Sequence, residues 1–197
     1  MWTKNKNPLL FFRKKKIDSI FGLYLQINHL KQLYRQGWLE RGLSLEKCES
    51  VADHCFGVAM LVLMLDSRYS LNIDVNRAVI MALIHELGEV YAGDITPNQK
   101  ISKKEKYLLE KKGIYKLFEK FPEAKWIIEL WEEYEKGKTP EAIFVRQLDK
   151  LEMAFQAKIY HAQCGMPADD FLEDVLAKLE GTMLIDFLDE KGGKHER

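Results

Sequence analysis

The apolar residues of this chain recur with the period of an α-helix along most of its length. In the segment after residue 50 they are separated by steps of four, three, four and three residues, which places them on one helix face. These residues are Val51, Cys55, Val58, Val62 and Leu65. No segment alternates apolar and polar residues as a half-buried β-strand does. The pattern therefore predicts an all-α protein.

Residues that favour helix ends indicate several boundaries. Ser50 and Asp53 match the capping-box pattern S-x-x-D, so a helix is expected to begin at Ser50 and to carry His54 in its first turn. Asp74 is expected to cap the next helix, and Thr139, which a proline follows, is expected to cap a later one. The expected helices span residues 20–36, 50–69, 74–91, 103–121, 123–135, 140–164 and 168–188.

Length and charge favour one domain. The chain has 197 residues, of which 47% are hydrophobic, and this is enough for one sizeable core. We expect a single helical domain over residues 17–190, between a basic tail at 1–16 and a polar tail at 191–197. Basic and acidic residues both number 30, so no overall field attracts nucleic acid. No apolar run approaches the roughly 18 residues of a membrane span.

The cysteines and glycines exclude some classes of site. Cys48, Cys55 and Cys164 are odd in number and form no C-x-x-C pair, which argues against a disulfide scaffold and a zinc knuckle. A reducing cytoplasm fits this cysteine usage best. The sequence contains no P-loop, no glycine-rich dinucleotide motif and no H-E-x-x-H motif, so no organic cofactor is implied.

Polar residues interrupt the apolar pattern around two histidines. His54 lies in a helix that is apolar on more than one side, and His85 and Glu86 follow the continuously apolar segment AVIMALI. On an uninterrupted helix, Glu89 shares one face with His85. Each residue has an ordinary explanation when it is taken alone. A core histidine can bond to a carbonyl, and a carboxylate at a helix end can face solvent.

Two aspartates complete this set of polar residues. Asp94 follows a glycine, as is common in turns, and Asp149 adjoins an apolar stripe, where it can pair with Arg146 or Lys150. Taken together, however, two histidines and several carboxylates come from three helices of one bundle. Neutral imidazole and carboxylate are ligands for hard-to-borderline divalent metals. The sequence therefore favours a metal site over a purely structural bundle.

Four ordered segments of the chain resemble one known family. They are RQGWLERG, ESVADH, ALIHELGEVYAGDITP and ELWEEYEKGKTPEAIFVRQLDKLEMAFQA. They resemble the HD-domain metal-dependent phosphohydrolases and, more narrowly, their 5′-deoxynucleotidase (HDDC-type) group. The similarity covers roughly residues 23–165. It implies an HD-type helical bundle that works as a homodimer on a nucleotide substrate.

The resemblance also implies roles for particular residues. It implies catalytic acids at Glu89 and Asp94, and it implies that Arg35 and Trp38 hold the phosphate and the nucleoside. Arg41 is an alternative to Arg35 as the phosphate ligand. The implied ion is divalent, with Mn, Co, Mg, Zn, Ni and Fe all open. Its implied ligands are His54, His85, Glu86 and Asp149.

The sequence departs from the family pattern at one metal ligand. The family is named for a His-Asp pair, and this chain has Glu86 after His85. The glutamate offers the same oxygen atoms on a stem that is one methylene longer. The implied activity is phosphate release from deoxynucleoside 5′-monophosphates. The alternatives are an HD-type hydrolase of triphosphates, pyrophosphates or phosphodiesters, and a nucleotide-binding module that has lost catalysis.

Overall fold

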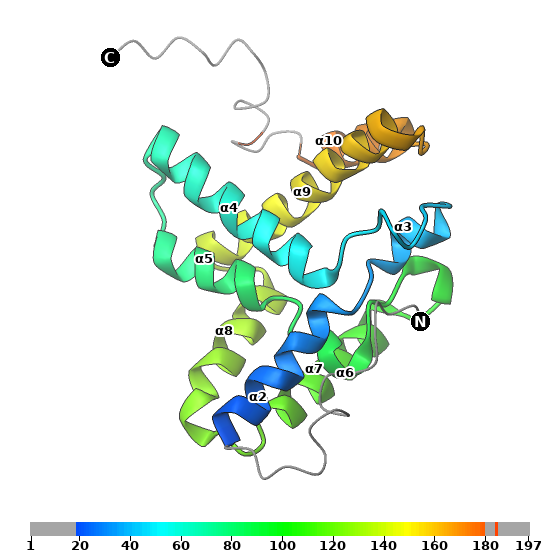
Figure 1. Ribbon diagram of the computed structural model, residues 1–197. Helices are drawn as coiled ribbons and strands as arrows, with labels where there is room; N and C mark the ends of the chain where they lie inside the picture. The colour runs from blue at the N-terminus through cyan, green and yellow to red at the C-terminus, as the bar shows by residue number, and fades with distance from the viewer. Residues whose placement is uncertain (1–18, 180–183, 185–197) are drawn as a thin grey trace.

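The computed structural model describes residues 19–179 and Leu184, and every named element within them is a helix (Figure 1). The all-α prediction is therefore confirmed. The elements are α2 (Ser19–Ile27), η1 (Asn28–Lys31), α3 (Gln36–Glu40), α4 (Val51–Tyr69), α5 (Val75–Ile84), α6 (Glu89–Ala92), η2 (Pro97–Gln99), α7 (Lys103–Leu117), η3 (Pro122–Ala124), α8 (Lys125–Lys136), α9 (Pro140–Cys164) and α10 (Asp169–Leu179).

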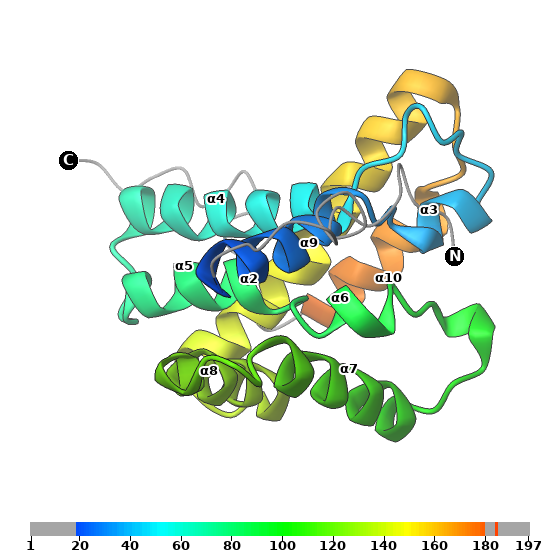
Figure 2. The ribbon, with the colours of Figure 1, turned by 60° about the horizontal axis from the view of Figure 1, so that its bottom comes forward.

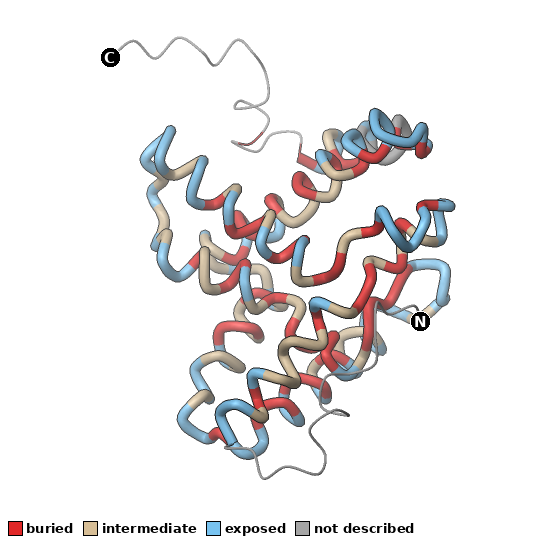
Figure 3. Tube along the Cα trace, viewed as in Figure 1, coloured by how far each residue is buried: buried red, intermediate tan, exposed pale blue. Residues whose placement is uncertain are grey.

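Three helices form the centre of the bundle. α4 packs on α5, and the long helix α9 packs on both of them. α8 lies against α5 and α9, and α6 lies against α7, so that α7 and α8 form the opposite side of the molecule from α4 (Figure 2). The residues of α4, α5 and α9 that face one another are buried, and their outer faces are exposed (Figure 3).

The predicted helix caps are present. The side chain of Ser50 accepts a hydrogen bond from the backbone N–H of Asp53, whose carboxylate accepts one from the N–H of Ser50 at 2.8 Å. Asp74 and Thr139 each accept a hydrogen bond from the backbone N–H three residues further on. These caps fix where α4 and α9 begin, and so they set the position of His54 in the first turn of α4.

The first predicted helix, over residues 20–36, is shorter than expected. α2 ends at Ile27, a 3₁₀ turn follows, and Tyr34 pairs with Ser50 in an isolated antiparallel bridge. This bridge joins the two ends of the loop at residues 35–49. Pairing with a distant segment therefore overrides the helical pattern of the sequence.

The predicted helix over residues 74–91 is interrupted at the position of most interest. α5 ends at Ile84 and α6 begins at Glu89. Bonds of the i→i+3 type span the gap, such as that from the N–H of Glu89 to the carbonyl of Glu86 at 3.0 Å. The expectation that His85 and Glu89 share one face of a continuous helix is therefore wrong.

The apolar stripe predicted for α9 fails at its C-terminal end. Phe155 and Ile159 continue the helical spacing of Phe144, Leu148 and Leu151, which predicts their burial, but they are 37% and 44% exposed. The buried residues there are instead Ala154, Ala157 and Tyr160. Steps of three are shorter than one helical turn of 3.6 residues, so the buried face rotates around the helix axis. This rotation brings Tyr160 to the cluster of residues around the loop at 35–49.

Some predictions fall outside the described residues. These are the basic tail at 1–16, the polar tail at 191–197, and most of the part of the last helix that was expected beyond residue 179. Along the part of the chain that the structure describes, no helix is both long enough and apolar enough to cross a membrane.

The turn after α5 packs directly on the backbone of α7. A Cβ atom at Gly113 would lie 2.3 Å from the carbonyl oxygen of Gly88, and one at Gly88 would lie 2.7 Å from Cβ of Glu110. Both distances are too short for real side chains, so the two segments meet through glycines. This contact sets the distance between α7 and the turn that carries His85 and Glu89.

Replacing Gly113 with alanine tests this contact. We expect Gly113→Ala to lower the free energy of unfolding by about 1–3 kcal/mol, because the methyl group meets backbone atoms that cannot rotate away. Gly22→Ala is the matched control, since nothing lies within 4 Å of a Cβ atom added there. Urea unfolding followed by circular dichroism measures both variants. Equal unfolding midpoints for wild type and Gly113→Ala would contradict the contact.

Candidate metal centre

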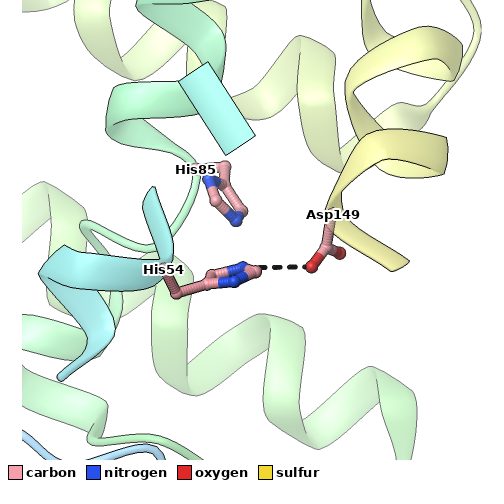
Figure 4. Close-up of side chains that lie close together, drawn as sticks. All are labelled: His54, His85 and Asp149. Carbon is pink, nitrogen blue, oxygen red and sulfur yellow. Dashed lines mark ion pairs between the residues drawn. The ribbon is translucent and has the colours of Figure 1, made fainter. Parts of the chain in front are cut away.

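Three predicted ligands from distant parts of the chain meet inside the bundle. His54 comes from the first turn of α4, His85 from the turn after α5, and Asp149 from the middle of α9 (Figure 4). One ligand atom of each lies within 4.8 Å of the others. Oδ1 of Asp149 is 3.1 Å from Nε2 of His54. The structure thus brings together two imidazoles and one carboxylate.

His85 presents one ring nitrogen to this group. Its Nδ1 lies 2.7 Å from the carbonyl oxygen of Ala82, to which it can donate. Its Nε2 is buried and makes no hydrogen bond within the described residues. Burial lowers the pKa of His85, which favours the neutral ring. Because Nδ1 carries the proton in this arrangement, Nε2 offers a lone pair to a cation.

His54 is completely buried between two carboxylates of α9. Its Nδ1 lies 2.6 Å from Oε2 of Glu152, while Nε2 faces Asp149. Burial and Arg35 lower the pKa of His54, but the bonds to Asp149 and Glu152 outweigh them and raise it to about 9. The same contacts hold the pKa of Asp149 below its usual value, against the effect of burial. The surroundings of Nε2 therefore favour positive charge.

These observations fit a borderline divalent metal. The donor set comprises two imidazole nitrogens and one carboxylate oxygen, Nε2 of His85 has no hydrogen-bond partner among the described residues, and the surroundings are negative. Imidazole and carboxylate are common ligands of zinc, manganese, cobalt, nickel and iron, and this group contains no thiolate. The explanation of Asp149 as an edge residue does not hold, because its carboxylate faces His54 and accepts from the hydroxyl of Tyr134 at 3.2 Å.

The fourth predicted ligand, Glu86, lies beside this group. Its Oε1 is 3.5 Å from Nε2 of His85 and 3.7 Å from Nη1 of Arg35. Its carboxylate also belongs to a second group, in which oxygens of Glu86, Glu89 and Glu110 lie within 4.8 Å of one another. The carboxylate of Glu86 thus lies between the ring of His85 and the other two glutamates.

Glu89 does not face solvent. It is only 1% exposed, and neither of its carboxylate oxygens makes a hydrogen bond within the described residues. Nζ of Lys106 lies 4.0 Å from it and 3.3 Å from Oε1 of Glu110. Burial, and then the nearby Glu86, raise the pKa of Glu89 well above its usual value. Glu89 therefore favours its protonated form.

Glu86 has the opposite tendency. Burial raises its pKa, but His85, Lys106 and Arg35 together bring it below the usual value. Two neighbouring carboxyl groups with separated pKa values are a common arrangement where one group donates a proton and the other carries charge.

Asp94, the second predicted catalytic acid, is bound by Arg35, the predicted phosphate ligand. Its Oδ1 accepts from Nη1 of Arg35 at 3.2 Å, and its Oδ2 accepts from the backbone N–H of Gln36. These bonds connect the loop after α6 to the start of α3, so Asp94 has a role beyond ending a turn. Nη2 of Arg35 lies 3.1 Å from Sδ of Met153. The guanidinium is therefore fixed by groups from two distant segments.

A cavity of about 610 Å³ opens beside these residues. Trp38 lines it but is only 4% exposed, and its Nε1 donates to Oε1 of Glu49 at 2.7 Å. Both candidate phosphate ligands, Arg35 and Arg41, line the cavity. The lining residues are Arg35, Gly37, Trp38, Glu40, Arg41, Glu86, Asp94, Ile95, Thr96, Pro97, Asn98, Lys106, Asp149 and Met153.

Some residues of the centre were missed by the sequence analysis. Glu152 follows Asp149 by three residues, so its position on the same face of α9 could have been noticed. Lys106 and Glu110 have the i,i+4 spacing of an ordinary exposed pair, and nothing in their pattern indicated burial. No sequence feature indicated that Tyr134 and Glu49 lie at the centre.

Comparison with known proteins shows the family of this chain. A model of the HD domain family matches residues 27–183. The chain is 43% identical to the 5′-deoxynucleotidase HDDC2 of Dictyostelium discoideum, over 68% of this chain and 73% of that protein. It is 35% identical to the Homo sapiens protein of the same name, over 83% and 80% of the two chains.

Solved structures show the same relationship. A conserved hypothetical protein from Pyrococcus furiosus superimposes with a TM-score of 0.71 and 33% sequence identity, and the match covers 87% of this chain and 97% of that one. A second structure, of the PH0347 protein from Pyrococcus horikoshii, gives a TM-score of 0.63 at 34% identity, over 81% and 95% of the chains. The chain therefore belongs to the HD domain family, in the group of the proteins named 5′-deoxynucleotidase HDDC2.

Proposed function

We propose that this protein is a metal-dependent phosphomonoester hydrolase that releases phosphate from deoxynucleoside 5′-monophosphates. One observation carries the proposal. The group of His54, His85 and Asp149 adjoins a cavity that is lined by three cationic side chains together with four carboxylates, in a chain whose relatives are named 5′-deoxynucleotidases. Arginine and lysine beside a carboxylate-rich metal centre suit a small dianionic phosphate ester.

The proposed ligands are the three residues of this buried group together with Glu86, which lies beside His85. When bound, a divalent ion supplies Lewis-acid activation of water and of a phosphate oxygen. The chain itself orients these ligands. The carbonyl of Ala82 accepts a hydrogen bond from Nδ1–H of His85, and the carboxylate of Glu152 accepts one from Nδ1–H of His54. This directs both Nε2 atoms to the same point.

Glu89 is the proposed general acid. Burial raises the pKa of Glu89, which favours the protonated carboxyl group, and this proton can be given to the leaving 5′-oxygen. Asp94 holds Arg35 at the edge of the cavity, so the guanidinium is already oriented when a phosphate enters. Arg35 then stabilises the charge on the equatorial phosphate oxygens. Trp38 and Arg41 line the space left for the nucleoside.

The sequence also predicts a homodimer and a cytoplasmic location, and both remain predictions. The metal, the base and the sugar preference are parts of the proposal that the assay below is designed to determine.

The first test compares phosphate release by wild type with that by His54→Ala and Asp149→Ala. The substrates are dAMP, dCMP, dTMP and AMP, each with Mn²⁺, Co²⁺ or Mg²⁺. We expect both variants to lose activity by at least about 100-fold. Each substitution removes a proposed metal ligand, and the loss should exceed that caused by removing a residue that only hydrogen-bonds to a ligand. The matched control is Glu129→Ala, since Glu129 is exposed on α8 and, within the part of the chain that the structure describes, forms an ion pair with Lys125.

The same assay separates the alternatives. Equal phosphate release by wild type and both ligand variants would contradict the proposed metal centre. Release of diphosphate from triphosphates, with no action on monophosphates, would favour another HD-type hydrolase. A wild-type protein that binds nucleotide but remains inactive with every ion would favour a binding module, in which Glu86 faces the second carboxylate group and not the metal.

The second test concerns the acid role of Glu89. We expect Glu89→Gln to reduce kcat for dAMP by about 10²–10⁴-fold, because the amide cannot donate a proton to the leaving oxygen. An aryl phosphate has a leaving group that needs no proton, so its loss of kcat should be much smaller. Metal content by mass spectrometry should match wild type. An equal loss of kcat on both substrates would rule out the acid role.

A further inference from the structure

Two carboxylates of α9 contact opposite ends of one buried imidazole. Oδ1 of Asp149 lies 3.1 Å from Nε2 of His54, and Oε2 of Glu152 lies 2.6 Å from Nδ1 of the same ring. His54 has no exposed surface and Glu152 is only 9% exposed, so water does not compete for the contact between them. The two acids are one helical turn apart on α9, but they act on different nitrogen atoms.

The contact at Nδ1 has a chemical consequence. An ionised carboxylate only accepts hydrogen bonds, so Nδ1 must carry a proton and donate it. When a cation takes the place of a proton on Nε2, the ring is neutral, its remaining proton is on Nδ1 and its lone pair is on Nε2. Nε2 is the atom that faces Asp149 and His85. Glu152 therefore selects the form of His54 that can bind a cation on the side of the metal centre.

A glycine on α4 makes room for this carboxylate. Gly57 lies one turn after His54, and a Cβ atom there would lie 2.7 Å from Oε1 of Glu152 and 3.0 Å from its Cγ. Alanine is intrinsically better than glycine inside a helix. At this position, however, a methyl group would displace the carboxylate from the ring. The glycine on α4 and the glutamate on α9 thus form one fitted contact.

We propose that Glu152 is a positioning residue of the metal centre, which fixes the tautomer and the orientation of His54, and that Gly57 provides the space for its carboxylate. The inference rests on the proposed metal site, although the hydrogen bond at Nδ1 exists independently of it. A carboxylate that hydrogen-bonds to a ligating histidine typically contributes about 10–100-fold to metal affinity.

The hydrogen bond itself is measured by NMR on ¹⁵N-labelled protein without added metal. A buried ring N–H that donates to a carboxylate gives a slowly exchanging proton signal at low field. The signal that tests the proposal is that of the Nδ1–H of His54, assigned through its own ¹⁵N atom and so distinguished from an Nε2–H that faces Asp149. We expect this Nδ1–H signal in wild type and its loss in Glu152→Ala. A variant with the exposed carboxylate removed, Glu129→Ala, should keep it. Persistence of the signal in Glu152→Ala would overturn the proposal.

Metal affinity is measured by titration with Zn²⁺ and Mn²⁺. We expect Glu152→Ala to weaken binding by about 10–100-fold. Glu152→Gln should restore most of this loss, because an amide oxygen accepts the same hydrogen bond. Unfolding of the metal-free variants shows whether each is folded. A residue that only stabilises the fold would change unfolding and leave the affinity of the folded protein at the wild-type value, and that result would overturn the proposal.

Gly57→Ala provides the sharper test because it leaves every ligand and Glu152 in place. In the wild-type background it should weaken metal binding by displacing the carboxylate. In the Glu152→Ala background it should have no effect, since no carboxylate remains to displace. Equal effects in both backgrounds would overturn the proposal. If the wild type binds no metal, the proposed function fails, and the low-field signal alone still decides whether Glu152 fixes His54.

Discussion

The hydrogen-bonded contact between α4 and α9 at His54 is the constraint on which the centre depends. A fully buried imidazole is costly unless both of its nitrogens find partners, and here Glu152 and Asp149 lie at its two ends. Because both carboxylates come from one helix, satisfying the ring fixes the register of α9 against α4. Asp149 is thereby directed toward His85. The same contacts therefore pack α9 against α4 and bring the three residues of the centre together.

Local signals predicted the elements that carry the centre better than they predicted its geometry. Caps at Ser50, Asp74 and Thr139 depend on neighbouring residues, so the sequence was sufficient to find them. The break after Ile84 depends on the approach of α7 through Gly113, which lies far along the chain. The sequence pattern could not locate this break. AVIMALI is apolar on every side, so it is compatible with a helix that ends at any nearby residue.

The site was predicted in the same uneven way. His54, His85 and Asp149 were identified as polar interruptions of buried stripes, and the structure brings them together. The resemblance to a known family added roles that spacing could not supply. What sequence reasoning could not reach were contacts between helices: the pairing of Glu152 with His54, and the enclosure of Glu89 by Lys106. An exposed i,i+4 pair and one whose lysine faces a buried carboxyl group look identical before the helices are placed.

The antiparallel bridge between Tyr34 and Ser50 has a consequence for how this fold can diversify. The loop that it closes, residues 35–49, carries Trp38 and Arg41 at the cavity, whereas the metal-binding group lies on the helices outside it. Because the ends of this segment are tied to each other, its exposed residues at 44–47 can change without moving α4. If the proposed function holds, changes there would alter the surroundings of the substrate and leave His54, His85 and Asp149 in place.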